Sequence, residues 1–142
     1  MNAAITLDQA RRVLAAQPFN DLVGAQLTEF ADGVAILELV IEDRHRQQHG
    51  LVHGGVLAYL ADNALTFAAG SLLGSAVVTT SLTIHYLRAA RGGSLTAKAT
   101  VTHRTSRRAV CTVDLVAVAP GGETDAIAIA TGTAAATGTT TR

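Results

Sequence analysis

The longest apolar stretch of the chain follows a short polar turn and runs from Val56 to Gly74. Two polar residues, Asp62 and Asn63, interrupt it near its start. A run this apolar predicts a helix that is buried on most sides, not a surface helix with one apolar stripe. Burying a carboxyl group is costly unless the group is paired or takes part in chemistry. Asp62 therefore needs an explanation.

A shorter amphipathic segment precedes this helix. Residues Leu7 to Ala16 predict a helix with Thr6 as its N-cap, because Gln9 follows three residues later and Pro18 lies beyond the predicted end. Residues 20–24 are predicted to form a connector.

Alternating apolar and polar positions, separated by glycine-rich or charged turns, predict strands in the rest of the chain. These strands are Gln26–Ala31, Val34–Ile41, Ala76–Leu87, Leu95–His103, Ala109–Ala119 and Asp125–Ala135. Asp32-Gly33 is a strong turn signal, so the first two strands should form a hairpin. In the third strand one face should carry Val78, Thr80, Leu82, Ile84 and Tyr86, and the other Thr79, Ser81, Thr83 and His85.

This order of elements predicts an α+β domain, in which an antiparallel sheet wraps around one long central helix. We expect residues 20–136 to form this domain, residues 1–19 to form an N-terminal helix and connector, and residues 137–142 to form a frayed tail. An open sheet has exposed edges, and pairing an edge across a dimer removes one of them.

Composition narrows the function classes. The chain has 142 residues, 49% apolar and 15% charged, which excludes a disordered chain and suits one domain with hidden surface. The formal net charge is zero, which disfavours a general nucleic-acid or membrane-surface binder. The single cysteine, Cys111, is expected to be a core residue in a reducing compartment. No secretory signal is evident in residues 1–18, so we expect a soluble, cytoplasmic protein without a membrane partner.

The motif His53-Gly54-Gly55, followed by apolar residues and then Asp62, resembles the centre of hotdog-fold acyl-CoA thioesterases of the phenylacetate-degradation (PaaI-like) branch. The later segment TTSLTIHYLRAARGGSLTAKATVTHRTSRRAV is similar to that family too, so the resemblance spans roughly residues 20–135. It implies the hotdog fold, a homodimer with a continuous sheet and commonly a homotetramer. It also implies hydrolysis of an acyl-CoA thioester without a metal or other cofactor.

Thioester hydrolysis needs a base or nucleophile, and donors for the oxyanion. A helix N-terminus offers unpaired N–H groups, so the Gly54 N–H, together with Gly55, is the candidate oxyanion donor. The alternative is a glycine turn needed only for tight entry into the helix. Asp62 is the candidate base or nucleophile, and it either attacks directly or activates water. The alternative is a buried aspartate whose carboxylate is satisfied by hydrogen bonds or lies at a polar dimer interface.

Gly54 and Asp62 are eight residues apart, about 12 Å along a helix, whereas both must lie about 3 Å from the reacting group. Either one of them is not catalytic, or each site combines Gly54 from one subunit with Asp62 from another. Two antiparallel helices across a two-fold axis would satisfy the second case.

Other residues are weaker candidates. Gln47 replaces the asparagine that is usual in the family fifteen residues before the aspartate, and its amide could bind the thioester carbonyl or the water. His53 could orient the turn or touch the thioester. Thr79, with Thr80 and Ser81 as neighbours, matches a position where the family carries a hydroxyl. Further substrate-binding candidates are Asn63, on a polar stripe with Tyr59, Asp62 and Thr66, and the CoA-phosphate candidates Arg88, Arg104, Ser106, Arg107 and Arg108.

Three rival interpretations remain. His45, His49 and His53 at i, i+4 and i+8 would form a metal site if they shared one helix, although Gly50 interrupts them. A non-catalytic hotdog module could bind acyl-CoA without needing Asp62. A hotdog dehydratase or hydratase would usually pair a histidine with a carboxylate at a different spacing.

Overall fold

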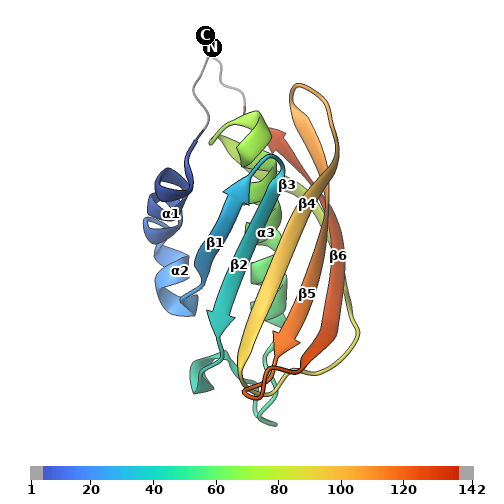
Figure 1. Ribbon diagram of the computed structural model, residues 1–142. Coiled ribbons are helices and arrows are strands. Elements are labelled where there is room, and N and C mark those ends of the chain that lie inside the picture. Colours follow the sequence, from blue (N-terminus) through green and yellow to red (C-terminus); the bar gives the residue numbers. More distant parts are fainter. Residues whose placement is uncertain (1–4, 138–142) are drawn as a thin grey trace.

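A six-stranded antiparallel sheet wraps around one long helix in the computed structural model, which describes residues 5–137 (Figure 1). The elements are α1 (Leu7–Ala15), α2 (Pro18–Val23), β1 (Gln26–Ala31), β2 (Val34–Val40), the short 3-10 helix η1 (Asp43–His45), α3 (Gly54–Leu73), β3 (Val77–Tyr86), β4 (Ser94–Arg104), β5 (Arg108–Val118) and β6 (Thr124–Ala136). The sheet order is β1-β2-β4-β5-β6-β3, and β1 and β3 form its edges. This arrangement confirms the predicted α+β class.

The central helix α3 is the core of the fold. Leu60, Ala61, Ala64 and Leu65 on α3 have no exposed surface, and they pack against side chains that alternate along the strands. By length and composition alone α3 could cross a membrane, with a mean hydropathy of 1.4 over its most apolar window. More than half of that window, 56%, is buried inside the domain, as expected for the core helix of a globular fold.

The N-terminal helix α1 has the predicted cap. The Thr6 hydroxyl accepts from the Gln9 N–H at 3.1 Å, and the Gln9 side chain accepts from the Thr6 N–H at 2.8 Å. The connector predicted over residues 20–24 is wrong, because residues 20–23 belong to the helix α2, and Pro18 both lies beyond the end of α1 and begins α2. Proline suits the first helical position since its missing N–H would be unpaired there anyway. Gly24, at φ 86°, ends α2.

Strand β3 departs from the predicted alternation. Between Thr79 and Ser81 the pairing with β6 shifts by one residue, so Thr80 is an additional residue in a β-bulge. A bulge reverses the alternation of faces from that point on. Thr79 therefore shares the partly buried face toward α3 with Leu82 and Ile84, whereas Val78 is exposed. The predicted single face from Val78 to Tyr86 was wrong for this reason.

Hydrogen bonds hold both ends of the described chain against the rest of the domain. Arg11 of α1 donates from Nε to the Leu27 carbonyl of β1 at 2.9 Å, which places α1 beside that edge of the sheet (Figure 1). Thr137 donates its N–H to the Ala76 carbonyl at 2.8 Å. The remainder of the predicted tail, residues 138–142, lies outside the described residues.

At Gly132, β6 lies so close to β3 and α3 that a side chain has no room. A Cβ there would lie 2.6 Å from the Ser81 carbonyl oxygen and 2.7 Å from Cδ2 of Leu65. We expect Gly132→Ala to lower the free energy of unfolding by about 1–3 kcal/mol, because the backbone of β3 must move. Urea unfolding followed by circular dichroism measures the change. Gly92→Ala is the control, since a Cβ at Gly92 meets nothing within 4 Å. Equal unfolding midpoints for the two variants would contradict the packing argument.

Candidate functional site

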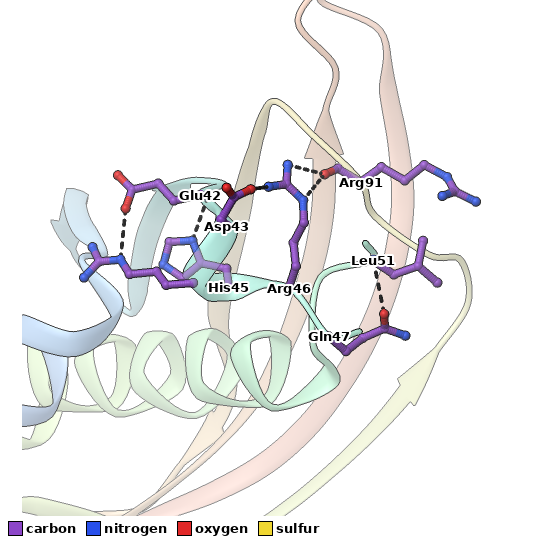
Figure 2. Close-up of polar contacts among 8 residues, drawn as sticks. Glu42, Asp43, His45, Arg46, Gln47, Leu51 and Arg91 are labelled. Carbon is purple, nitrogen blue, oxygen red and sulfur yellow. Dashed lines mark hydrogen bonds and ion pairs between the residues drawn. The ribbon is translucent and has the colours of Figure 1, made fainter. Parts of the chain in front are cut away.

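The polar turn before α3 is organised by Gln47. Its side-chain oxygen accepts from the N–H of His49 at 2.5 Å. The same oxygen accepts from the N–H of Leu51 at 3.3 Å (Figure 2). The extra methylene of glutamine lets the side chain span this turn. The Gln47 amide NH2 has no hydrogen-bond acceptor within residues 5–137, so it is available as a donor.

Residues just before this turn anchor it to the β3–β4 loop and to α2. Figure 2 shows Arg46 between the Asp43 carboxylate, at 2.6 Å, and the Arg91 carbonyl, which accepts from Nε at 3.2 Å and Nη2 at 2.9 Å. His45 is buried; its Nδ1 accepts from the Glu42 N–H at 2.9 Å, so its Nε2 donates to the Val23 carbonyl at 2.7 Å. The sequence did not reveal these supports, because the partners lie up to 45 residues away.

The first turn of α3 leaves one N–H group unpaired. His53 is the N-cap, and its Nδ1 accepts from the Gly55 N–H at 2.8 Å. The Val56 N–H is paired with the His53 carbonyl at 2.9 Å. No acceptor within residues 5–137 bonds the Gly54 N–H. The Gly54 N–H is therefore open to a ligand, whereas the N–H of Gly55, the second predicted oxyanion donor, is occupied by His53.

An open pocket brings several predicted site residues together. Gln47, Gly54 and Arg88 line it, with Tyr86 at the end of β3 and Leu57 on the first turns of α3. Its volume is about 370 Å³. Arg88 reaches Asp125 at 3.6 Å, but both side chains are mostly exposed, so this ion pair holds the arginine only weakly. The pocket combines two uncharged donors with a cation that could meet a phosphate.

Asp62 lies further along the same helix. Thr79 Oγ1 donates to Asp62 Oδ1, and the bulge in β3 is what turns Thr79 toward α3. Within the described part of the chain nothing bonds Oδ2 of Asp62, and the side chain is half-buried. Since α3 is unbroken from Gly54 to Leu73, the Gly54 amide and Asp62 are about 12 Å apart along it. The structure brings Asp62 and Thr79 together, and it separates this pair from the Gly54 of the same chain.

Two other polar residues of the predicted stripe, Tyr59 and Asn63, form hydrogen bonds within the domain. Asn63 is buried, and its Nδ2 donates to Tyr59 Oη at 2.9 Å and to Gln17 Oε1 at 3.0 Å. Tyr59 donates to Asn20 Oδ1 at 2.8 Å, and burial raises the pKa of Tyr59, with the nearby Asp62 charge adding to the effect. These contacts join α3 to α2 and to its N-cap residue, Gln17. They correct the prediction that Asn63 binds substrate, since its amide is fully used inside the domain.

An apolar pocket lies one helical turn beyond Asp62. Val13 of α1, Phe30 of β1, Thr66 and Phe67 of α3 and Val77 of β3 contribute to its lining. Its volume is about 110 Å³. Thr66 follows Asp62 by four residues and Val77 precedes Thr79 by two, so the Asp62–Thr79 pair lies beside this pocket.

The other predicted arginines lie at the opposite end of the molecule. Arg104 donates to the Leu72 carbonyl near the end of α3 at 3.3 Å, and Arg107 donates to the Ala136 carbonyl at 3.3 Å. Arg108 and Ser106 are exposed at the same β4–β5 turn. From Gly54 this end is about 28 Å away along α3. Only Arg88 among the arginine candidates lines the pocket at Gly54.

The histidines of the rival metal site do not come together, and the single cysteine is buried. His45 belongs to η1, His49 to a turn and His53 to the N-cap, so these histidines do not share a helix face. No group of three potential ligands occurs within residues 5–137. Cys111 is fully buried, and burial raises the pKa of its thiol to about 11. A thiol in this state is a poor nucleophile at neutral pH.

Comparison with known proteins identifies the same stretch. The family model of the thioesterase superfamily matches residues 49–122, a range that includes Gly54, Asp62 and Thr79. The acyl-coenzyme A thioesterase PaaI of Escherichia coli K12 is 32% identical over 95 residues, which cover 66% of this chain and 67% of that protein.

Solved structures show the same fold over nearly the whole chain. A thioesterase family protein from Silicibacter pomeroyi superposes with a TM-score of 0.85 at 29% identity, covering 92% of this chain and 98% of its own. Zebra fish thioesterase superfamily member 2 superposes with a TM-score of 0.81 at 28% identity, covering 94% and 99%. These similarities confirm the hotdog fold that the His53-Gly54-Gly55 motif implied.

Proposed function

This chain belongs to the thioesterase superfamily, as a PaaI-like hotdog protein, and we propose that it hydrolyses acyl-CoA thioesters to the free acid and CoA. One observation carries the proposal. The helix α3 begins with an unpaired N–H in an open pocket and bears, two turns later, a carboxylate held by one neighbouring hydroxyl. A donor for an oxyanion and a base for water are the two parts that thioester hydrolysis requires.

Each residue then has a defined role in the reaction. Oδ2 of Asp62 takes a proton from water as the water oxygen bonds to the thioester carbon, while Thr79 holds Oδ1. The carbonyl oxygen becomes an oxyanion, which accepts from the Gly54 N–H and from the Gln47 amide. The carbon–sulfur bond then breaks, and the thiolate takes the proton from Asp62. The products are one carboxylic acid and one CoA thiol, so water is the only co-reactant.

Two subunits are needed to assemble this site. The 12 Å between Gly54 and Asp62 on one helix exceeds the span of a reacting carbonyl with its water. The sheet supports a dimer, because α1 lies beside the β1 edge while no described strand pairs with the outer side of β3. Val78 and Tyr86 on β3 are each about half exposed, at 50% and 53%. Pairing of two β3 edges would place α3 beside its copy and join each Asp62 to the partner's Gly54. A homotetramer, as the resemblance implies, would be two such dimers.

The apolar pocket beyond Asp62 suits the acyl group. Its lining is mostly aromatic and aliphatic, and Phe30 and Phe67 meet edge to face with ring centroids 6.2 Å apart. An apolar cavity of about 150 Å³ takes up benzene in another protein, so a pocket of this size accommodates a group of a few carbons. The acyl group of the substrate is therefore short or a single aromatic ring.

Asp62→Asn tests the base. The amide cannot accept a proton from water, so we expect kcat to fall by about 10²- to 10⁴-fold with little change in KM or in acyl-CoA binding. Steady-state kinetics on acyl-CoA and binding calorimetry measure both. Asp114→Asn on the exposed face of β5 is the matched control and should retain full activity. Unchanged turnover in Asp62→Asn would refute the assignment of Asp62 as the base. Acyl-CoA binding by the wild type without any turnover would instead leave the non-catalytic acyl-CoA-binding module as the better description.

A heterodimer tests the shared site. Gly54→Pro removes the donor N–H at a position where proline suits a helix start, and Asp62→Asn removes the base. Each variant alone should be inactive. A heterodimer of the two, isolated through two different affinity tags, has one intact site of two and should show about half of the wild-type activity. If both groups acted within one subunit, every site would be defective and the heterodimer would stay at the background rate.

The acyl pocket predicts a chain-length preference. With a panel of short, aryl and long-chain acyl-CoAs, we expect kcat/KM to be highest for acyl groups of about four to eight carbons, including one aromatic ring. Phe67→Leu enlarges the pocket and should move the optimum toward longer chains. A wild-type optimum at long chains would show that the acyl group binds elsewhere.

A further inference from the structure

The second peptide unit of α3, between Gly54 and Gly55, is held at both ends by side chains. Its carbonyl oxygen accepts from the Tyr86 hydroxyl at 3.0 Å. Its N–H donates to Nδ1 of His53 at 2.8 Å. One of these hydrogen bonds comes from the end of β3 and the other from the N-cap of the helix. A residue distant in sequence and a neighbouring one therefore fix the same peptide plane.

This peptide needs support because glycine flanks it on both sides. A Gly-Gly step lacks the Cβ atoms that restrict φ and ψ, and its peptide plane rotates more freely than any other. The Gly54 N–H lies in the His53–Gly54 peptide plane, and the orientation of that plane is set by ψ of His53 and φ of Gly54. The preceding residue is already fixed, because the His53 N–H donates to the His45 carbonyl at 2.8 Å. Holding the following peptide removes the remaining freedom.

Tyr86 reaches this peptide because residue 54 has no side chain. A Cβ at Gly54 would lie 3.3 Å from Cζ and 3.4 Å from Cε1 of the tyrosine ring. The ring thus lies against the helix start and forms a wall of the pocket that holds Gln47 and Arg88. The absence of a side chain at Gly54 therefore has two consequences. The Gly54 N–H stays open to a ligand, and the Tyr86 hydroxyl, which fixes the direction of that N–H, can reach the peptide.

We propose that Tyr86 is a positioning residue for thioester hydrolysis, which with His53 keeps the Gly54 N–H aimed at the oxyanion. The proposal rests on the proposed function of Gly54 as the oxyanion donor. Tyr86 acts on the reaction through the peptide and forms no bond with the reacting atoms. An oxyanion donor contributes mainly in the transition state, so misdirecting it affects turnover more than substrate binding.

Tyr86→Phe is the test, because it removes only the hydroxyl and keeps the ring. We expect kcat to fall about 3- to 10-fold, the range for loss of one hydrogen bond, with KM within two-fold of the wild type. The control is Tyr59→Phe, the same change at the only other tyrosine of the chain. It should lower the urea midpoint through loss of its bonds to Asn20 and Asn63, and leave kcat unchanged. An unchanged kcat in Tyr86→Phe, or a raised KM alone, would overturn the positioning role.

A second measurement does not depend on activity. Labelling with ¹⁵N-glycine gives a spectrum of the 13 glycine amides, in which ¹⁵N relaxation reports the order of Gly54 and Gly55. Tyr86→Phe should lower the order parameters of these two residues and leave those of distant glycines such as Gly132 unchanged. Unchanged order at Gly54 and Gly55 would overturn the proposal. If the wild-type protein hydrolyses no acyl-CoA, the proposed function fails, and the relaxation data alone decide whether Tyr86 holds this peptide.

Discussion

The structure depends on the burial of α3 by a single curved sheet. Most of the helix surface is covered by apolar side chains from β2, β4, β5, β6 and β3, so only one stripe of it remains accessible. Gly55, Ala58, Asp62 and Thr66 lie on that stripe and are all at least partly exposed. A helix that must be apolar on every covered side can carry an ionisable catalytic side chain only along its accessible stripe. The placement of Asp62 is therefore a consequence of the fold.

The sequence predicted the parts of the structure that depend on local pattern. The cap at Thr6, the hairpin at Asp32-Gly33, the six strands and the glycine start of α3 all follow from signals within a few residues. The prediction failed where a local signal was ambiguous. Pro18 is compatible both with the end of one helix and with the start of another. The β-bulge at Thr80 has no local sequence signal, because the strand is rich in threonine and valine throughout. That bulge decides which hydroxyl meets Asp62, so an error of one residue in the strand would have exchanged Thr79 for a neighbour.

The supports of the site could not be read from the sequence for a different reason. Arg46 with Arg91, His45 with Val23 and Tyr86 with Gly54 join segments that are 22 to 45 residues apart. Each bond is between a side chain and a backbone carbonyl, and a carbonyl carries no trace in the amino-acid sequence. The residues that do the proposed chemistry stand in a recognisable motif. The residues that hold them in place are recognisable only after folding.

The same logic explains why a glutamine serves at position 47. An asparagine side chain at this position is one methylene shorter, so its amide could bond the turn or reach the pocket but could not do both. Gln47 does both with opposite ends of one amide: the oxygen closes the turn on His49 and Leu51, and the NH2 group remains for a ligand. The His53 side chain follows the reverse pattern, since it occupies the Gly55 N–H and leaves the Gly54 N–H open. Together, Gln47 and His53 leave two donor groups unpaired at the pocket, and the site needs no hydrogen-bond acceptor beside these donors.

An arrangement of unpaired donors facing a pocket is complementary to a developing negative charge on oxygen, which a thioester carbonyl acquires only when it is attacked. In the dimer proposed above, the water that attacks this carbonyl would be activated by Asp62 of the partner subunit.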